Sequence, residues 1–172
     1  SLAFSNVSEP SSYTWHAIIS AHLKLFLLNH AFDLYYNMQS EGMLCSPIIS
    51  LAMVKGCTDQ NALREGRILH CYIMSCNFEA DLALGSALVD LYSACRKVND
   101  AQQVFDSLPN KDAATWGAMI GGHVQVGQGI LALSLFDKLQ MEGIKPTDAT
   151  FSSTLKACGI TGELPIGRQV HH

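Results

Sequence analysis

Residues 115–147 read TWGAMIGGHVQVGQGILALSLFDKLQMEGIKPT, and residues 14–22, TWHAIISAH, begin in the same way. In the longer stretch, apolar residues first recur at the spacing of one helix face, at Trp116, Met119, Ile120 and Val124. After a polar and Gly-containing break comes a second amphipathic run, made of Ile130, Leu133, Leu135, Phe136 and Leu139. Gly143 suits a left-handed C-cap, and Pro146 follows it. The stretch therefore predicts two antiparallel helices of about a dozen residues each.

The pattern recurs when the chain is shifted by 101 residues against itself. This comparison gives 17 identities over the 71 overlapping positions without a gap, whereas unrelated sequences would match at about four. Repetition at such a period predicts stacked structural units. We divide the chain into a tail of a preceding unit, four units and an incomplete unit, at residues 1–11, 12–46, 47–81, 82–112, 113–147 and 148–172. In the third unit we expect helices at residues 82–94 and 98–108.

The composition indicates an ordered, all-α chain. Hydrophobic residues make up 48% and charged residues 15% of the 172 residues, and no sustained period-two alternation predicts a strand. No apolar run approaches the roughly 18 residues that a membrane helix needs, so we expect no membrane segment. The net charge of −4 argues against strong non-specific nucleic-acid binding but leaves binding in a local groove possible.

Residues with reactive side chains are interpreted first as structural. The six cysteines form no C-x-x-C pair and are expected to be reduced thiols. His70, Cys71 and Cys76 lack zinc-site spacing and a fourth ligand. Trp15 and Trp116 could stack on bases, but their apolar partners at i+3 and i+4 favour packing between helices. No pair of carboxylates indicates acid–base catalysis, so we predict neither an enzyme nor a cofactor or metal site.

The succession of units resembles the pentatricopeptide repeat family, and specifically its plant subclass with repeats of alternating length. The 35-residue type is seen in TWHAIISAH (14–22) and TWGAMIGGHVQVGQ (115–128), the longer type in LAMVKGCTDQNALREGRILHCYIMSCNFEAD (51–81) and FSSTLKACGITGELPIGRQVHH (151–172), and the short type in LALGSALVDLYSACRKVNDAQQVFDSLPNKD (82–112). The resemblance implies a right-handed α-solenoid of stacked antiparallel helical hairpins. It also implies binding of single-stranded RNA, with one repeat for each base.

In this family the fifth residue of a repeat and its last residue read the base. Carried over to this chain, the pairs are His16 with Ser46, Leu51 with Asp81, Ser86 with Asp112, and Gly117 with Thr147, and the incomplete repeat contributes Ser152. Ser86 with Asp112 is the pair of standard type, which in the family favours guanine. The second residues, expected to sandwich the bases, are Tyr13, Ile48, Ala83, Ala114 and Ala149. Lys24 matches a phosphate-facing position, where its counterpart Gln125 is neutral.

The resemblance implies part of a mitochondrial or chloroplast protein that specifies sites of RNA processing or of cytidine-to-uridine editing. The H-x-E and P-C-x-x-C signature of the editing deaminases is absent from this sequence. We therefore expect such chemistry elsewhere in the protein or in an editing-complex partner. The alternative is a helical-repeat scaffold for protein–protein interaction, as tetratricopeptide arrays are. An RNA-binding array predicts basic residues such as Lys24, Arg96, Lys97 and Lys111 along one rim of the groove, whereas a scaffold predicts an apolar or acidic groove.

A last expectation concerns assembly. Both ends of the chain cut through a repeat, and solenoid ends need polar caps. We expect Leu155, Ile160 and Ile166 to leave an apolar end that promotes self-association.

Overall fold

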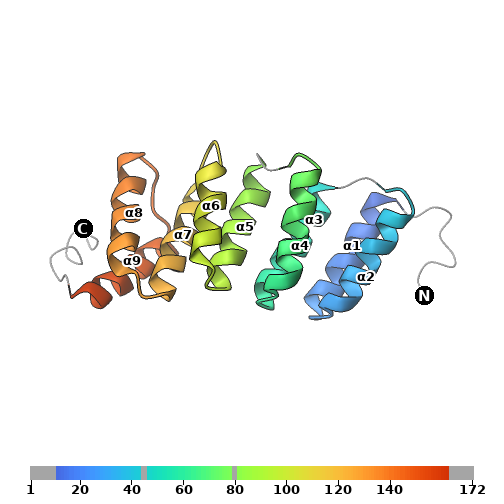
Figure 1. Ribbon diagram of the computed structural model, residues 1–172, viewed down its shortest axis with the longest axis horizontal. Coiled ribbons are helices and arrows are strands. Elements are labelled where there is room, and N and C mark those ends of the chain that lie inside the picture. The colour runs from blue at the N-terminus through green and yellow to red at the C-terminus, as the bar shows by residue number, and fades with distance from the viewer. Residues whose placement is uncertain (1–10, 44–45, 79–80, 163–172) are drawn as a thin grey trace.

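The computed structural model describes residues 11–43, 46–78 and 81–162, and within these ranges the chain is all-helical, as predicted. Figure 1 shows antiparallel helical hairpins side by side along the longest axis of the molecule. Each helix has 13 residues except α6, with 10, and α9, with 14. The helices are α1 (Ser12–Lys24), α2 (Leu28–Ser40), α3 (Pro47–Asp59), α4 (Leu63–Ser75), α5 (Leu82–Ala94), α6 (Val98–Ser107), α7 (Ala113–Gln125), α8 (Gly129–Met141) and α9 (Asp148–Thr161).

The hairpins form two layers with different packing. The first helices, α1, α3, α5, α7 and α9, pack in series against one another, and each second helix packs against its own partner and the next first helix. Within the described part of the chain, the backbones of the second helices stay apart, and these helices meet only through side chains such as Tyr35 with Tyr72 and Arg67 with Asp100. Close packing in one layer and separation in the other curve the array, so that the first helices form its inner face. The structure is therefore an α-solenoid.

The first helices start at capping residues. The side chains of Ser11, Asp81, Asp112 and Thr147 each accept a hydrogen bond from the backbone amide three residues on, at 3.3, 2.9, 2.8 and 3.2 Å. These bonds satisfy amide groups that lack an intrahelical partner at a helix start. Ser46 holds the same position before α3, where Pro47 opens the helix.

Burial follows the predicted helical spacing except at Val124, which is half-buried, and at Ile130. Trp15 and Trp116 are 2% and 6% exposed, and the Trp116 ring meets Phe105 edge-on at 4.9 Å between centroids, so both tryptophans are packing residues as predicted. Met119, Ile120, Leu133, Leu135, Phe136 and Leu139 are also buried. Ile130 was expected in the same apolar run but is 72% exposed. The buried residues at the start of α8 are Gly129 and Ala132, because α8 approaches α9 closely there.

Each hairpin turn contains a residue in the left-handed region. Phe26, Asn61, Arg96 and Gly127 have φ of 57, 51, 57 and 78°, and each lies between the two helices of one hairpin. Gly143 follows α8 with φ of 69°, which confirms the expected left-handed cap. A non-Gly residue in this region is strained by about 1–2 kcal/mol.

We expect Phe26→Gly to raise the free energy of unfolding by about 0.5–1 kcal/mol. The relieved strain of about 1–2 kcal/mol exceeds the roughly 0.5–1 kcal/mol that the flexibility of glycine adds to the unfolded chain. The Phe26 side chain is 68% exposed, so little apolar burial is lost. Urea denaturation measures the change. Gly127→Ala is the matched control, and its free energy of unfolding should be lower by about 1 kcal/mol. Destabilisation by Phe26→Gly would contradict the strain argument.

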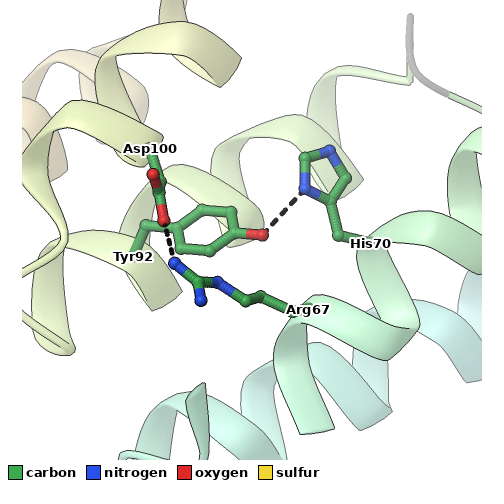
Figure 2. A network of polar contacts seen from close by, with 4 residues as sticks. All are labelled: Arg67, His70, Tyr92 and Asp100. Carbon is green, nitrogen blue, oxygen red and sulfur yellow. Dashed lines mark hydrogen bonds and ion pairs between the residues drawn. The ribbon is translucent and has the colours of Figure 1, made fainter. Parts of the chain in front are cut away.

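A polar network joins the separated outer helices. Arg67 of α4 donates to Asp100 of α6 at 2.7 Å, and Nδ1 of His70 lies 2.9 Å from the hydroxyl of Tyr92 on α5 (Figure 2). Burial, and then the charge of Asp100, raise the pKa of Tyr92 to about 12, while burial lowers the pKa of His70. Tyr92 is therefore protonated and His70 neutral near neutral pH, and the tautomer of His70 sets which of the two donates the hydrogen bond. The Arg67–Asp100 pair is too exposed to add much stability, but it spans the gap between α4 and α6.

We expect the stability of the protein to decrease between about pH 7 and pH 5, partly through His70. Its lowered pKa in the folded state means that the unfolded chain binds the proton more tightly, so stability is complete above the unfolded pKa and is lost below it. Urea denaturation of the wild type and of His70→Gln at both pH values isolates this histidine from the others. The same pH dependence in both proteins would show that His70 makes no contribution.

Candidate nucleic-acid interface

A groove of about 630 Å³ runs along the inner face, over α3, α5 and α7 and up to the start of α9. Eight of the residues that line it are positions that the family resemblance had selected from the sequence. They are Leu51, Ala83, Ser86, Asp112, Ala114, Gly117, Thr147 and Ala149. The expected fifth, second and last positions of neighbouring repeats thus face one open hollow, because the first helices that carry them are stacked in register.

Ser86 and Asp112, the expected standard pair, both line this groove. Ser86 lies one turn into α5 and is half-buried, whereas Asp112 is exposed at the start of α7. Oδ1 of Asp112 accepts from the backbone amide of Thr115 at 2.8 Å and from the Thr115 hydroxyl at 2.7 Å. Partial burial alone would raise the pKa of Asp112, but hydrogen bonds from Thr115 and from the Ala114 amide outweigh it and lower the pKa. The groove therefore presents a carboxylate in its charged form at neutral pH.

The pair Gly117 and Thr147 is arranged differently. Gly117 leaves the α7 backbone bare, and a Cβ there would lie 2.9 Å from Oγ1 of Thr150 and 4.0 Å from Oγ1 of Thr147. Those two hydroxyls lie 2.9 Å apart, and Thr147 also accepts from the Thr150 amide. The space that a side chain at position 117 would occupy therefore faces two hydroxyl groups at the start of α9.

The other expected site residues lie outside this groove. Asp81 caps α5, accepting from the Leu84 amide, and His16 of α1 pairs with Ser20 at 3.4 Å. Tyr13 and Ile48 are 82% and 64% exposed on α1 and α3, as befits side chains without a partner inside the protein. Ser46 precedes α3, Lys24 is the exposed last residue of α1, and Ser152 is exposed on α9.

The charged residues of the groove do not form the basic rim that RNA binding would favour. Lys55 is the cation that lines it, together with Asp90 and Asp112. Desolvation by the surrounding helices raises the pKa of Asp90, Asp59 raises it further, and Lys55 opposes the rise. Lys111 is held by the Leu108 carbonyl at 2.9 Å and lies over the Phe105 ring.

Of the cations expected at the rim, Arg96 lines a hollow next to the groove. This hollow shares Ala94 and Gln125 with the groove. Phosphate neutralisation by the described groove residues is therefore weak.

The structure adds residues that the sequence comparison did not select. Gly121 and Gly122 of α7 and Ser93 of α5 belong to the groove lining, and a Cβ on Gly122 would lie 2.6 Å from Oγ of Ser93. The buried Ser93 hydroxyl has no hydrogen-bond partner among the described residues. Thr115 and Thr150 were also missed, although a recurring signal marks them. A threonine lies three positions after each of the capping residues Ser11, Asp112 and Thr147.

Other types of site find little support in the described part of the chain. No three His, Cys, Asp or Glu residues there are grouped so that they could hold a metal ion. The five cysteines within it are free thiols, and Cys45 lies outside it. No helix in the same ranges is both long and apolar enough to cross a bilayer. Expectations for residues 1–10 and 163–172, including Ile166, also lie outside the described residues.

Comparison with known proteins identifies the repeat. Residues 13–43 match the family model described as PPR repeat, and residues 111–159 match the one described as PPR repeat family. A putative pentatricopeptide repeat-containing protein of Arabidopsis thaliana is 33% identical over 170 residues, which cover 98% of this chain and 25% of that protein. Both kinds of match support the pentatricopeptide repeat family for this chain. It spans about a quarter of the length of the first curated relatives it matches.

Other relatives and solved structures extend the comparison. A chloroplastic and a mitochondrial pentatricopeptide repeat-containing protein of Arabidopsis thaliana are 33% and 31% identical over 168 residues; the matches cover 98% of this chain and 27% and 16% of those proteins. The crystal structure of maize PPR10 in complex with an 18-nt psaJ RNA element matches with a TM-score of 0.78 at 15% identity, over 95% of this chain and 25% of that one. The crystal structure of nuclear proteinaceous RNase P 2 of A. thaliana matches with a TM-score of 0.74 at 14% identity, over 95% of this chain and 38% of that one. At these identities the structural likeness concerns the fold.

We expect Asp112→Ala to lower the free energy of unfolding by about 1 kcal/mol, because α7 loses its capping side chain. Asp112→Asn should stay close to the wild type, since asparagine caps a helix about as well as aspartate. Urea denaturation of the three proteins measures both effects. Equal stability of Asp112→Ala and the wild type would show that the cap contributes nothing.

Proposed function

We propose that this chain binds single-stranded RNA along the groove of the first helices, with successive repeats addressing successive bases. The observation that carries the proposal is the convergence of Ser86 and Asp112, with Ala83 and Ala114, on one open groove. A charged carboxylate can accept hydrogen bonds from N–H groups on the edge of an unpaired base such as guanine. The likeness to an RNA-bound solenoid of the same family supports this assignment.

We further propose that the repeats alternate in length and belong to an organellar RNA-processing or editing specificity factor without catalysis of its own. The left-handed turn residues Phe26, Asn61, Arg96 and Gly127 support the alternation, because they lie 35, 35 and 31 positions apart. Relatives named as chloroplastic or mitochondrial support the location. On this view the chemistry belongs to other parts of the protein or to editing-complex partners.

The charges in the groove determine which interactions contribute to the affinity for RNA. With Lys55 opposed by Asp90 and Asp112, counterion release contributes little, and affinity depends on base contacts. Alanines at the second position offer small surfaces for stacking, so each repeat adds little. Binding by these repeats alone is therefore weak and changes little with salt. The same acidic character favours the alternative function, a helical scaffold whose groove accepts a protein segment.

We expect fluorescence anisotropy to show tighter binding of guanine-containing single-stranded RNA than of matched duplex RNA or single-stranded DNA. Ser86→Ala and Asp112→Asn should each weaken binding about fivefold, the loss of one hydrogen bond, while Asp112→Asn keeps the α7 cap. Ser107→Ala, which changes an exposed residue of α6, is the matched control for Ser86→Ala. Absence of binding at low salt, or equal binding of duplex RNA, would reject RNA recognition by this groove and favour the scaffold.

A further inference from the structure

In three inner helices the capping side chain forms a second hydrogen bond, with the hydroxyl group of the residue three positions on. Ser11 pairs with Thr14 at 3.1 Å, Asp112 with Thr115 at 2.7 Å, and Thr147 with Thr150 at 2.9 Å. In each case the partner lies three residues on and also supplies its backbone amide to the same side chain. Helix capping requires the amide bond alone, so the hydroxyl bond is an additional constraint on the capping side chain.

Two of these hydroxyl partners are buried beneath the groove. Thr115 and Thr150 are 0% exposed, although the residues they hold, Asp112 and Thr147, are exposed at the surface. A β-branched side chain packed in this way has little freedom about χ1 and presents its hydroxyl in a fixed direction. Thr150 also faces the space above Gly117, so it lies against both members of an expected base-reading pair.

We propose that Thr115 is a positioning residue, whose hydroxyl fixes the Asp112 carboxylate in the orientation that meets a base. This inference rests on the proposed RNA-binding function. Oδ1 of Asp112 receives both donors of Thr115, which leaves Oδ2 to accept from the base in the groove. A side chain already held in its bound orientation loses less conformational freedom on binding.

The repeat before it provides a contrast. Asp81 caps α5 through the Leu84 amide, and Leu84 has no hydroxyl to offer. Asp81 does not line the groove, whereas Asp112 and Thr147, which both have threonine partners, do. Of the two aspartate caps, the one held by a threonine at the third position of its repeat lines the groove, and the one followed there by a leucine does not.

The test compares Thr115→Val, Thr115→Ser and Thr150→Val in the whole chain. Carboxyl NMR titration reports on Asp112 without RNA, and anisotropy reports discrimination between RNA oligonucleotides that carry guanine or adenine at one position. We expect Thr115→Val to raise the pKa of Asp112, because one stabilising hydrogen bond is removed, and to reduce discrimination about fivefold. Thr115→Ser should restore both properties, and Thr150→Val, the same change one repeat away, should leave the Asp112 pKa unaltered.

Each readout can overturn a different statement. An unchanged Asp112 pKa in Thr115→Val shows that the hydroxyl does not hold the carboxylate and rejects the proposal. A raised pKa with unchanged discrimination rejects it as well, because the constraint then serves the helix alone. If the wild type binds no RNA, the proposed function fails and this inference fails with it, while the titration still shows whether Thr115 holds Asp112. If Thr115→Val is too unstable, Thr115→Ala provides the same comparison.

Discussion

The structure depends on direct packing between the first helices of neighbouring hairpins. Among them, α3, α5 and α7 each pack between two other first helices, which leaves these helices little exposed surface. The second helices lack this contact with one another and are joined instead by long side chains, as in Arg67 with Asp100 and Tyr35 with Tyr72. This asymmetry curves the array and leaves the inner layer as a continuous surface.

The start of each inner helix combines a structural and a functional requirement. A capping residue must lie at the N-terminus, and in a stacked array that point lies at the rim of the inner groove. Asp112 therefore stabilises α7 and presents a carboxylate to the groove at the same time. For this reason, loss of binding after removal of its side chain has two explanations, and only variants that keep the cap can separate them.

Much of the fold could be predicted because helix periods and self-similarity are local signals. The helices at Leu82–Ala94 and Gly129–Met141, the burial of Trp15 and Trp116, and the left-handed Gly143 all follow from spacing and end signals. The exposure of Ile130 could not be read from spacing, since it depends on how closely α8 approaches α9.

The site was predictable to a smaller extent. Family resemblance selected Ser86 and Asp112, and stacking of the helices brings them to one groove. The balance of Lys55 against Asp90 depends on which faces meet across two hairpins, and the role of the Thr115 hydroxyl depends on geometry at a helix start. Neither is visible in a repeat pattern that marks mainly apolar positions.

The measurement that tests the account most directly is NMR mapping of a guanine-containing single-stranded RNA on this chain. RNA binding in the inner groove predicts that the amide signals of Ser86, Gly117 and Gly121 on the inner helices shift with added RNA, while those of Arg67 and His70 on the outer layer stay in place. Shifts confined to the outer helices, or none at RNA concentrations well above the protein, would show that the inner groove is not an RNA-binding surface.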